Sequence, residues 1–298
     1  MEAARLPHLT IATSSDADHV PAETDTCDVV LGEPSLIARA LSRLRSASWI
    51  QSTWAGVEPL LDPTLRRDYV LTNAREVFGP LMSEYVFGYM IARERLMFEK
   101  REAQKAGRWD PTPPTTIGGK TLGLLGVGTI GAALAKTAKH FDMRVKGFTR
   151  SSESCPHVDE YFHDLSGDAR SRFAGDLDYL VSIMPNTPAT RAFVDASLLA
   201  ALPPRAVFIN PGRGATVDET ALAQALRAGQ IAGAILDVFQ TEPLPPDHIF
   251  WRLSNVIVTS HTAALSAPSD IAPLFIDNYR RFAAGEPLKY VVDFEAGY

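Results

Sequence analysis

The fold prediction depends above all on residues 120–150, KTLGLLGVGTIGAALAKTAKHFDMRVKGFTR. Residues 121–125 form a short uncharged run, typical of a buried strand, that leads directly into GVGTIG at 126–131. Apolar residues at helical spacing follow, and residues 143–148 then have the pattern of a second strand. Strand, glycine turn, helix and strand in this order predict half of a dinucleotide-binding fold.

The three glycines of this turn have separate expected roles. Gly126 allows the tight turn, Gly128 lets the backbone approach a pyrophosphate, and Gly131 lets helix and strand pack closely. The amides at the helix N-terminus then face the phosphates. The alternative is a glycine turn in an ordinary α/β protein.

The end of the second strand indicates which dinucleotide is bound. NAD sites usually place Asp or Glu there to accept hydrogen bonds from the ribose 2′-hydroxyl. Here Thr149, Arg150 and Ser151 follow the strand, and a guanidinium flanked by hydroxyls suits a 2′-phosphate. The pattern favours NADP(H), with NAD(H) possible if Arg150 is a solvated cation and Glu153 binds the ribose instead.

Composition narrows the class of protein. The chain has 298 residues, enough for two domains, with 46% hydrophobic and 21% charged residues, as in an ordinary soluble protein. A net charge of −6 gives no basic footprint for nucleic acid. Two cysteines are too few for a disulfide framework or a metal site, so we expect no metal and a reducing, cytoplasmic location. The N-terminus has no apolar run of signal-peptide length, and no segment is long and apolar enough to span a membrane.

The flanking segments predict a second, smaller domain. Short apolar runs at 9–12, 29–31, 49–51 and 69–72 suggest a small parallel α/β domain. A long helix is expected from Ser83, as N-cap, to residue 107, carrying the chain into the next domain. Later strands and helices complete a cofactor sheet of about six strands, and the final helix, from residue 271, is assigned back to the first domain.

A turn of small residues follows the 49–51 strand. The backbone amides of Ala55, Gly56 and Val57 can bind a substrate carboxylate, and the Trp54 side chain could line one side of the substrate pocket. Ligands in open α/β sheets bind at strand carboxyl ends, which favours a site, although the segment could be only a turn. Arg75 could contact the same ligand or be a solvated loop cation.

Three polar residues follow late strands of the cofactor sheet. Arg213 lies in NPGRG, Glu242 in DVFQTEP and His261 in TSHTAA. Each alone would be unremarkable. Together, at strand carboxyl ends facing a dinucleotide, they form a chemical set.

With GVGTIG, these motifs resemble the D-isomer-specific 2-hydroxyacid dehydrogenases, in particular their glyoxylate and hydroxypyruvate reductase branch, over nearly the whole chain. The resemblance implies an α/β fold in which a Rossmann-type doubly wound parallel sheet is inserted in a smaller flavodoxin-like α/β substrate domain. The expected bounds are 1–90 with 267–298 for the substrate domain and 91–266 for the NAD(P)-binding domain.

The resemblance also implies the chemistry. His261 would be the general acid in reduction of a 2-oxo acid and the base in oxidation, and Glu242 would raise its pKa. Arg213 would bind the substrate carboxylate and polarise the 2-oxo group. Asp237 matches an aspartate near the nicotinamide carboxamide, or would be a structural cap.

Further positions carried over from the family concern both ligands. Thr129 and Ile130 would supply pyrophosphate amides and Pro185 would line the adenosine side. Gly56 and Val57 match the carboxylate-binding loop. Those expected to border the nicotinamide are Pro211, Gly212 and Ala263.

The sequence departs from the family at several points. The usual aspartate after the second cofactor strand is replaced by Thr149 and Arg150, Ser260 stands where proline normally precedes the histidine, and Thr262 replaces an apolar residue. The first crossover, residues 14–28, is shorter than usual.

The function expected is therefore hydride transfer between NAD(P)H and a small 2-oxo acid, such as glyoxylate or hydroxypyruvate, to give a D-2-hydroxy acid. We expect a homodimer formed through the cofactor domain and no nucleic-acid or membrane partner. The alternative is an NAD(P)-sensing, corepressor-like binding protein on the same fold, and turnover lost in His261→Ala would separate the two.

Overall fold

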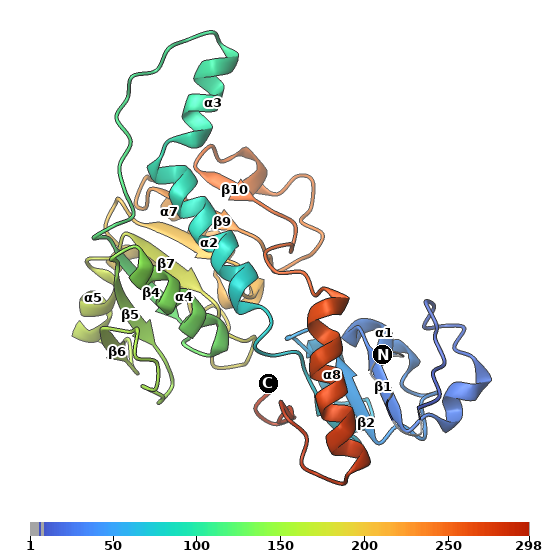
Figure 1. Ribbon diagram of the computed structural model, residues 1–298. Helices are drawn as coiled ribbons and strands as arrows, with labels where there is room; N and C mark the ends of the chain where they lie inside the picture. The colour runs from blue at the N-terminus through green and yellow to red at the C-terminus, as the bar shows by residue number, and fades with distance from the viewer. Residues whose placement is uncertain (1–5, 7–8, 298) are drawn as a thin grey trace. The chain divides into compact units, whose positions relative to one another are not determined.

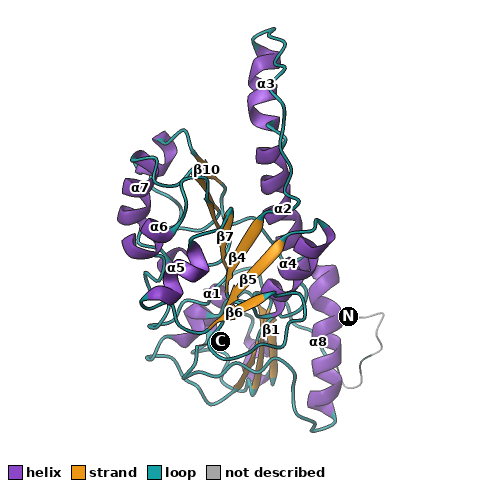
Figure 2. Ribbon diagram, turned by 90° about the vertical axis from the view of Figure 1, so that its left-hand side faces the viewer, coloured by secondary structure: helices purple, strands orange, loops and turns teal. Residues whose placement is uncertain are grey.

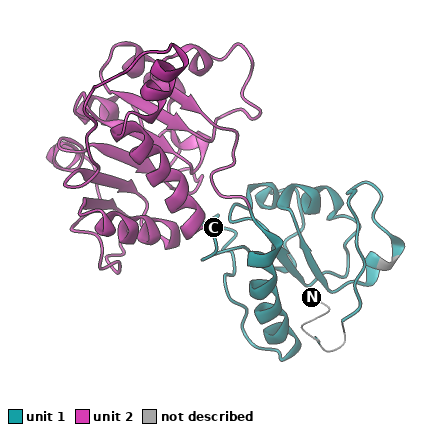
Figure 3. Cartoon of the chain, turned by 45° about the horizontal axis from the view of Figure 1, so that its top comes forward, with its two compact units in different colours: residues 1–77, 266–298 teal, residues 78–265 magenta. Residues whose placement is uncertain are grey.

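The computed structural model describes residue 6 and residues 9–297. The chain forms two compact units (Figure 3): unit 1 comprises Met1–Val77 and Ser266–Tyr298, and unit 2 comprises Phe78–Leu265. The functional domain bounds expected from the sequence stay a prediction. The expectation of no secretion signal concerns an N-terminus that lies partly outside the described residues.

Unit 2 is built on a parallel sheet of seven strands, all within described residues, in the order β10-β9-β8-β7-β4-β5-β6. The central strands are buried along their whole length, which is why they are uncharged runs without alternation. The strands are β4 (Thr121–Leu125), β5 (Arg144–Phe148), β6 (Glu160–Phe162), β7 (Tyr179–Ser182), β8 (Val207–Asn210), β9 (Gly233–Leu236) and β10 (Val256–Val258).

Helices cover both faces of this sheet (Figures 1 and 2). One core contains Val86 and Met90 with Leu134 and Ala138 of α4; the other contains Phe173, Leu199 and Leu222, among others. The helices of unit 2 are α2 (Gly79–Glu94), α3 (Met97–Lys105), α4 (Thr129–His140), α5 (Asp168–Ala174), α6 (Ala196–Ala201) and α7 (Glu219–Arg227). Neighbouring strand residues enter opposite cores, as Leu180 and Val181 do, so the sheet is doubly wound.

The strand order reverses beside β4. β5 and β6 extend the sheet on one side of β4, and β7 to β10 extend it on the other. In open α/β sheets, the crevice at such a switch point, outside the strand carboxyl ends, is where ligands bind. GVGTIG begins at the carboxyl end of β4.

Unit 1 has a parallel sheet of three strands in its described part, in the order β1-β2-β3. The strands are β1 (Val29–Gly32), β2 (Trp49–Ser52) and β3 (Val70–Thr72), with helices α1 (Pro34–Ala40) and α8 (Pro268–Ala283). Trp49 is fully buried and stacks on Phe275 of α8, with ring centroids 5.3 Å apart. The C-terminal segment thus completes the core of unit 1, and Thr72 forms an antiparallel bridge with Val291.

Two elements differ from expectation because tertiary contacts decided them. The run at 9–12 is not a strand; Leu9 instead packs on the cluster around Trp49 and Phe275. The cofactor sheet has seven strands rather than six. The missed strand, β6, has three residues and starts with Glu160, too short and too polar to be recognised as an apolar run.

The prediction of one long helix from Ser83 to residue 107 is also wrong in its start and its continuity. It starts at Gly79, with Pro80 in its first turn, and breaks at Leu96, whose φ of 54° is left-handed. Ser83 is not an N-cap: it is buried inside α2, where its Oγ lies 3.2 Å from Thr137 Oγ1 of α4.

No described helix is both long and apolar enough to cross a membrane. In the same part of the chain, His, Cys, Asp and Glu side chains do not gather in threes as a metal site would require.

Candidate active site

The glycine turn has the geometry that a dinucleotide pyrophosphate requires. Gly126 has a φ of 103°, and a Cβ on Gly131 would lie 2.4 Å from the Gly126 carbonyl oxygen, so both positions need glycine. A Cβ on Gly128 would meet nothing within 4 Å, which leaves this backbone open to a ligand. Helix α4 has no side-chain N-cap, and Thr129 and Ile130 supply its first amides. The residues present therefore fit a dinucleotide.

The segment after β5 lies at the same edge of the sheet. The Thr149 amide donates to Phe162 O of β6 at 2.9 Å, and its hydroxyl donates to Ser152 O at 2.8 Å. Arg150 and Ser151 are exposed. Glu153, the alternative ribose acceptor, is already engaged, because its Oε1 lies 2.8 Å from Nε2 of His163. His163 follows β6, and neither this residue nor that strand was predicted from the sequence.

His261 and Glu242 form a direct pair although they are nineteen residues apart in the chain. Nδ1 of His261 lies 2.8 Å from Oε2 of Glu242, and Oε1 of Glu242 accepts the Phe239 amide at 2.9 Å. The side chains remain 43% and 35% exposed, so a small molecule can reach them. Since the carboxylate can only accept, Nδ1 carries the proton of this contact.

This pair changes the titration of both groups. The hydrogen bond to Glu242 raises the pKa of His261 above its ordinary value, although burial and the positive charge of Arg213 oppose the shift. Burial favours protonated Glu242, yet the hydrogen bonds from His261 and the Phe239 amide hold the pKa of its carboxyl below the usual range. The positive charge of Arg213 lowers the pKa of both groups.

Asp237 holds the loop that carries His261. Its buried carboxylate, 1% exposed, accepts the Thr262 and Ala263 amides at 2.9 Å each, and its carbonyl accepts the His261 amide at 2.8 Å. Thr259 Oγ1 also donates to it and contacts Tyr85 OH of α2. Asp237 thus acts as the structural cap considered from the sequence, while its expected contact with the nicotinamide stays a prediction.

Arg213 is positioned by the loop after β8. Asn210, the last residue of β8, accepts the Gly212 amide at 3.2 Å and donates to Arg213 O at 3.1 Å. A Cβ on Gly212 would lie 2.7 Å from Ser182 O at the end of β7, so glycine keeps the two strand ends close. Pro211 and Gly212 are buried, and the carbonyl of Pro185 accepts from Thr190 Oγ1 at 2.6 Å.

The predicted substrate loop belongs to unit 1 and follows β2. Ala55 O accepts Asn73 Nδ2 at 2.8 Å, and Asn73 Oδ1 accepts Arg75 Nε at 3.0 Å, so Arg75 is connected to this loop. Val57 is buried, whereas Trp54 is 43% exposed. The substrate roles of Trp54, Ala55, Gly56, Val57 and Arg75 stay predictions.

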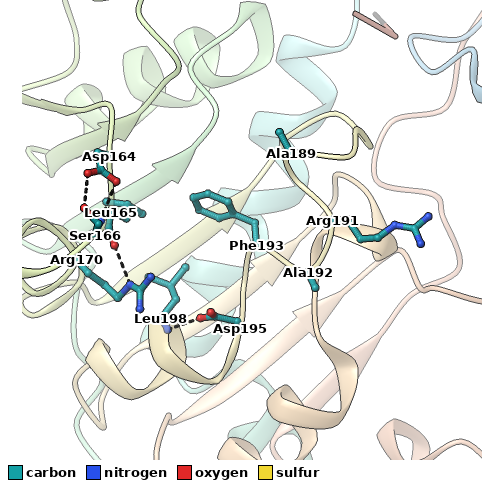
Figure 4. A pocket seen from close by; sticks show the side chains of 10 residues that line it. All are labelled: Asp164, Leu165, Ser166, Arg170, Ala189, Arg191, Ala192, Phe193, Asp195 and Leu198. Atoms are coloured by element: carbon teal, nitrogen blue, oxygen red, sulfur yellow. Dashed lines mark hydrogen bonds between the residues drawn. The ribbon is translucent and has the colours of Figure 1, made fainter.

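A pocket opens between the loops that follow β6 and β7 (Figure 4). The Phe193 ring lies between these loops and also packs on Phe148, the last residue of β5, at 4.9 Å between centroids. None of the lining residues was predicted, although six of them follow Pro185 in the segment after β7. They are Asp164, Leu165, Ser166, Arg170, Ala189, Arg191, Ala192, Phe193, Asp195 and Leu198.

A glycine turn that fits a pyrophosphate, at the switch point of a doubly wound sheet, with a histidine–carboxylate pair at later strand ends, defines the class of dinucleotide-dependent oxidoreductases. The family model of the D-isomer specific 2-hydroxyacid dehydrogenase NAD binding domain matches residues 87–263. The chain belongs to this family of dehydrogenases.

Individual relatives agree with this assignment. The chain is 35% identical over 217 residues, 73% of its length and 68% of the relative's, to glyoxylate/hydroxypyruvate reductase A of Serratia proteamaculans (strain 568). A D-isomer specific 2-hydroxyacid dehydrogenase family protein from Aeromonas salmonicida subsp. salmonicida A449 superimposes with a TM-score of 0.93 at 40% identity, covering 98% of this chain and 94% of the other.

An NADPH-dependent glyoxylate/hydroxypyruvate reductase from Sinorhizobium meliloti, solved with NADP and sulfate, superimposes with a TM-score of 0.79 at 31% identity. That alignment covers 91% of this chain and 86% of the other.

Proposed function

We propose that this protein is an NADPH-preferring reductase of small 2-oxo acids, such as glyoxylate or hydroxypyruvate, giving D-2-hydroxy acids. The observation that carries this proposal is the 2.8 Å contact between His261 and Glu242, in a unit whose glycine turn fits a dinucleotide. In this pair the imidazole of His261 can act as a proton donor.

Each of the three polar residues, His261, Glu242 and Arg213, has its own role in the reduction of the substrate. Nε2 of His261 delivers a proton to the 2-oxo oxygen, while Glu242 keeps the ring in its charged form. The Arg213 guanidinium binds the substrate carboxylate and stabilises negative charge developing on the oxygen. The hydride would come from the bound nicotinamide.

The remaining predicted contacts serve the two ligands. Gly126, Gly128 and the α4 amides bind the pyrophosphate, and Thr149, Arg150 and Ser151 bind the 2′-phosphate. Pro185 and the pocket around Phe193 take the adenosine end, while Pro211, Gly212, Asp237 and Ala263 border the nicotinamide. In unit 1, the amides of Ala55, Gly56 and Val57 bind the carboxylate, with Trp54 and Arg75 as further contacts.

The preference for NADPH has two supports. Arg150 and its flanking hydroxyls replace the carboxylate that NAD sites use, and Glu153 is engaged by His163. The reductase from Sinorhizobium meliloti, 31% identical, is NADPH-dependent and was solved with NADP. NADH would bind more weakly than NADPH.

Initial rates with NADPH and with NADH, against glyoxylate, hydroxypyruvate, pyruvate and a bulky 2-oxo acid, test the proposal. We expect turnover mainly with NADPH and the small acids, and its loss in His261→Ala. Cofactor binding without turnover of any 2-oxo acid would contradict the reductase and favour the NAD(P)-sensing, corepressor-like alternative. The ranking of acids measures the size of the substrate pocket.

Two further features belong to this proposal. We propose a homodimer formed through unit 2, whose helix α3 carries exposed Met97 and Phe98 and is followed by exposed Trp109. The cytoplasmic location expected from the low cysteine content is also kept as a proposal.

A further inference from the structure

His163 connects two loops at the adenosine side of the sheet. β5 and β6 are paired in register up to Phe148 and Phe162, so Thr149 and His163 directly follow the last pair. Nδ1 of His163 lies 3.0 Å from Thr149 O, and Nε2 lies 2.8 Å from Oε1 of Glu153. The ring thus joins the backbone beside Arg150 to a carboxylate that follows in the same loop.

The partners of this ring define its charge. A backbone carbonyl and a carboxylate can only accept hydrogen bonds, so both ring nitrogens must donate. The hydroxyl of Thr149, 3.2 Å from Nδ1, uses its own proton on Ser152 O and therefore also acts as an acceptor toward the ring. A ring that donates from both nitrogens is an imidazolium. The hydrogen bond to Glu153 raises the pKa of His163, in agreement with this geometry.

Glu153 is the acidic residue that could otherwise oppose NADPH. A carboxylate at this place in the fold accepts hydrogen bonds from a ribose 2′-hydroxyl and repels a 2′-phosphate. In the structure its Oε1 lies 2.8 Å from Nε2 of His163, and within the described residues this is the contact that holds its side chain, which is 59% exposed. Without His163, the carboxylate would be able to turn toward the ribose.

We propose that His163 is a specificity-determining residue for the cofactor: as an imidazolium held between Thr149 and Glu153, it neutralises and withdraws the Glu153 carboxylate from the 2′ position and so favours NADPH over NADH. This inference rests on the proposed NADPH site at Thr149, Arg150 and Ser151. His163 acts through Glu153 and is a positioning residue, not a catalytic one.

The test is a double-mutant cycle read by equilibrium binding of NADPH and of NADH, for example by quenching of tryptophan fluorescence. His163→Asn keeps a donor for Thr149 O but removes the charge and the contact with Glu153. We expect it to weaken NADPH binding by about two- to fivefold, the scale of an exposed charge interaction, and to leave NADH binding unchanged or tighter. In a Glu153→Gln background the same substitution should change NADPH binding by less than about twofold.

His140→Asn is the matched control, because His140 lies in the same unit and contacts only a carbonyl of its own helix, Lys136 O, among the hydrogen bonds of its ring described here. Equal weakening of both cofactors by His163→Asn, or an undiminished loss in the Glu153→Gln background, would show a merely structural role and overturn the inference. So would a wild-type protein that binds NADH as tightly as NADPH.

The binding assay contains no substrate, which separates this inference from the proposed function. Absent turnover with selective NADPH binding would reject the reductase but keep His163 as a specificity residue. Turnover of a 2-oxo acid together with equal binding of NADPH and NADH would keep the reductase and reject His163 as a specificity residue.

Discussion

His261 has a φ of 56°, a left-handed backbone conformation that a residue other than glycine adopts at a cost of about 1–3 kcal/mol. Such a conformation persists only where the surroundings determine it. Here the Asp237 carbonyl binds the His261 amide, and the Asp237 carboxylate binds the next two amides. The imidazole is thereby aimed at Glu242 without proline at position 260, so Ser260 does not leave the loop unsupported.

The raised pKa of His261 has a direct consequence for rate. With saturating NADPH, kcat/KM for glyoxylate should be high at low pH and fall as pH rises through the pKa of His261, because only the imidazolium can donate the proton. In Glu242→Gln the fall should begin at lower pH, since the charged ring loses its anionic partner.

Glu219→Gln is the control for this profile. Glu219 Oε2 lies 3.5 Å from His248 Nε2 in the same unit, and this histidine–carboxylate pair lies outside the proposed chemistry. Its loss should leave the profile in place. A rate of reduction that rises with pH would contradict the role of His261.

In the turn between β4 and α4, one glycine serves the packing of the protein and another serves ligand binding. Gly131 packs α4 against the turn, whereas Gly128 faces open space. The two glycines are three residues apart in one motif, yet only one of them is needed for the packing of the protein itself.

Gly131→Ala should lower the free energy of unfolding by about 1–3 kcal/mol, because the new methyl group would overlap the Gly126 carbonyl. Gly128→Ala should change it by less than about 1 kcal/mol but weaken NADPH binding by about tenfold or more, since a side chain would block the approach of the pyrophosphate. Urea unfolding and NADPH titration of both variants measure these effects. Equal destabilisation by the two substitutions would show that Gly128 is structural.

In the architecture of unit 2, helix α3 extends away from the sheet, and the chain that follows it runs back beside it (Figures 1 and 2). Lys100 Nζ ties the two together through Asp110 O at 3.2 Å and Thr112 O at 2.9 Å. Trp109 is 91% exposed, and Met97 and Phe98 are 51% and 46% exposed. Large apolar side chains gathered on one projecting segment are typical of a subunit interface.

We therefore expect light scattering to give twice the mass of the 32.5 kDa chain. Trp109→Ala combined with Phe98→Ala should shift the protein toward monomer, because buried aromatic residues dominate association energies. Trp251→Ala, which removes a 50% exposed tryptophan elsewhere in unit 2, should leave the mass unchanged. A monomeric wild type would contradict the dimer.

The sequence by itself was enough for the Rossmann-type sheet, its dinucleotide turn and the family. Each of these depends on contiguous patterns: uncharged strands, helical spacing, and glycines whose roles follow from their positions within six residues. The pairing of His261 with Glu242 was also predicted from the family motifs, and the structure places them 2.8 Å apart. The substrate residues of unit 1 stay predictions.

Other features depend on partners distant in the chain and became visible in the folded protein alone. β6 exists because it pairs with β5, and Ser83 lies inside α2 because the helix begins at a proline turn upstream and its hydroxyl meets Thr137. The contact of His163 with Glu153 arises from two strand ends lying side by side. Local spacing sets periodicity and backbone freedom, but which hydrogen-bonding groups meet is decided by the packing of the whole sheet.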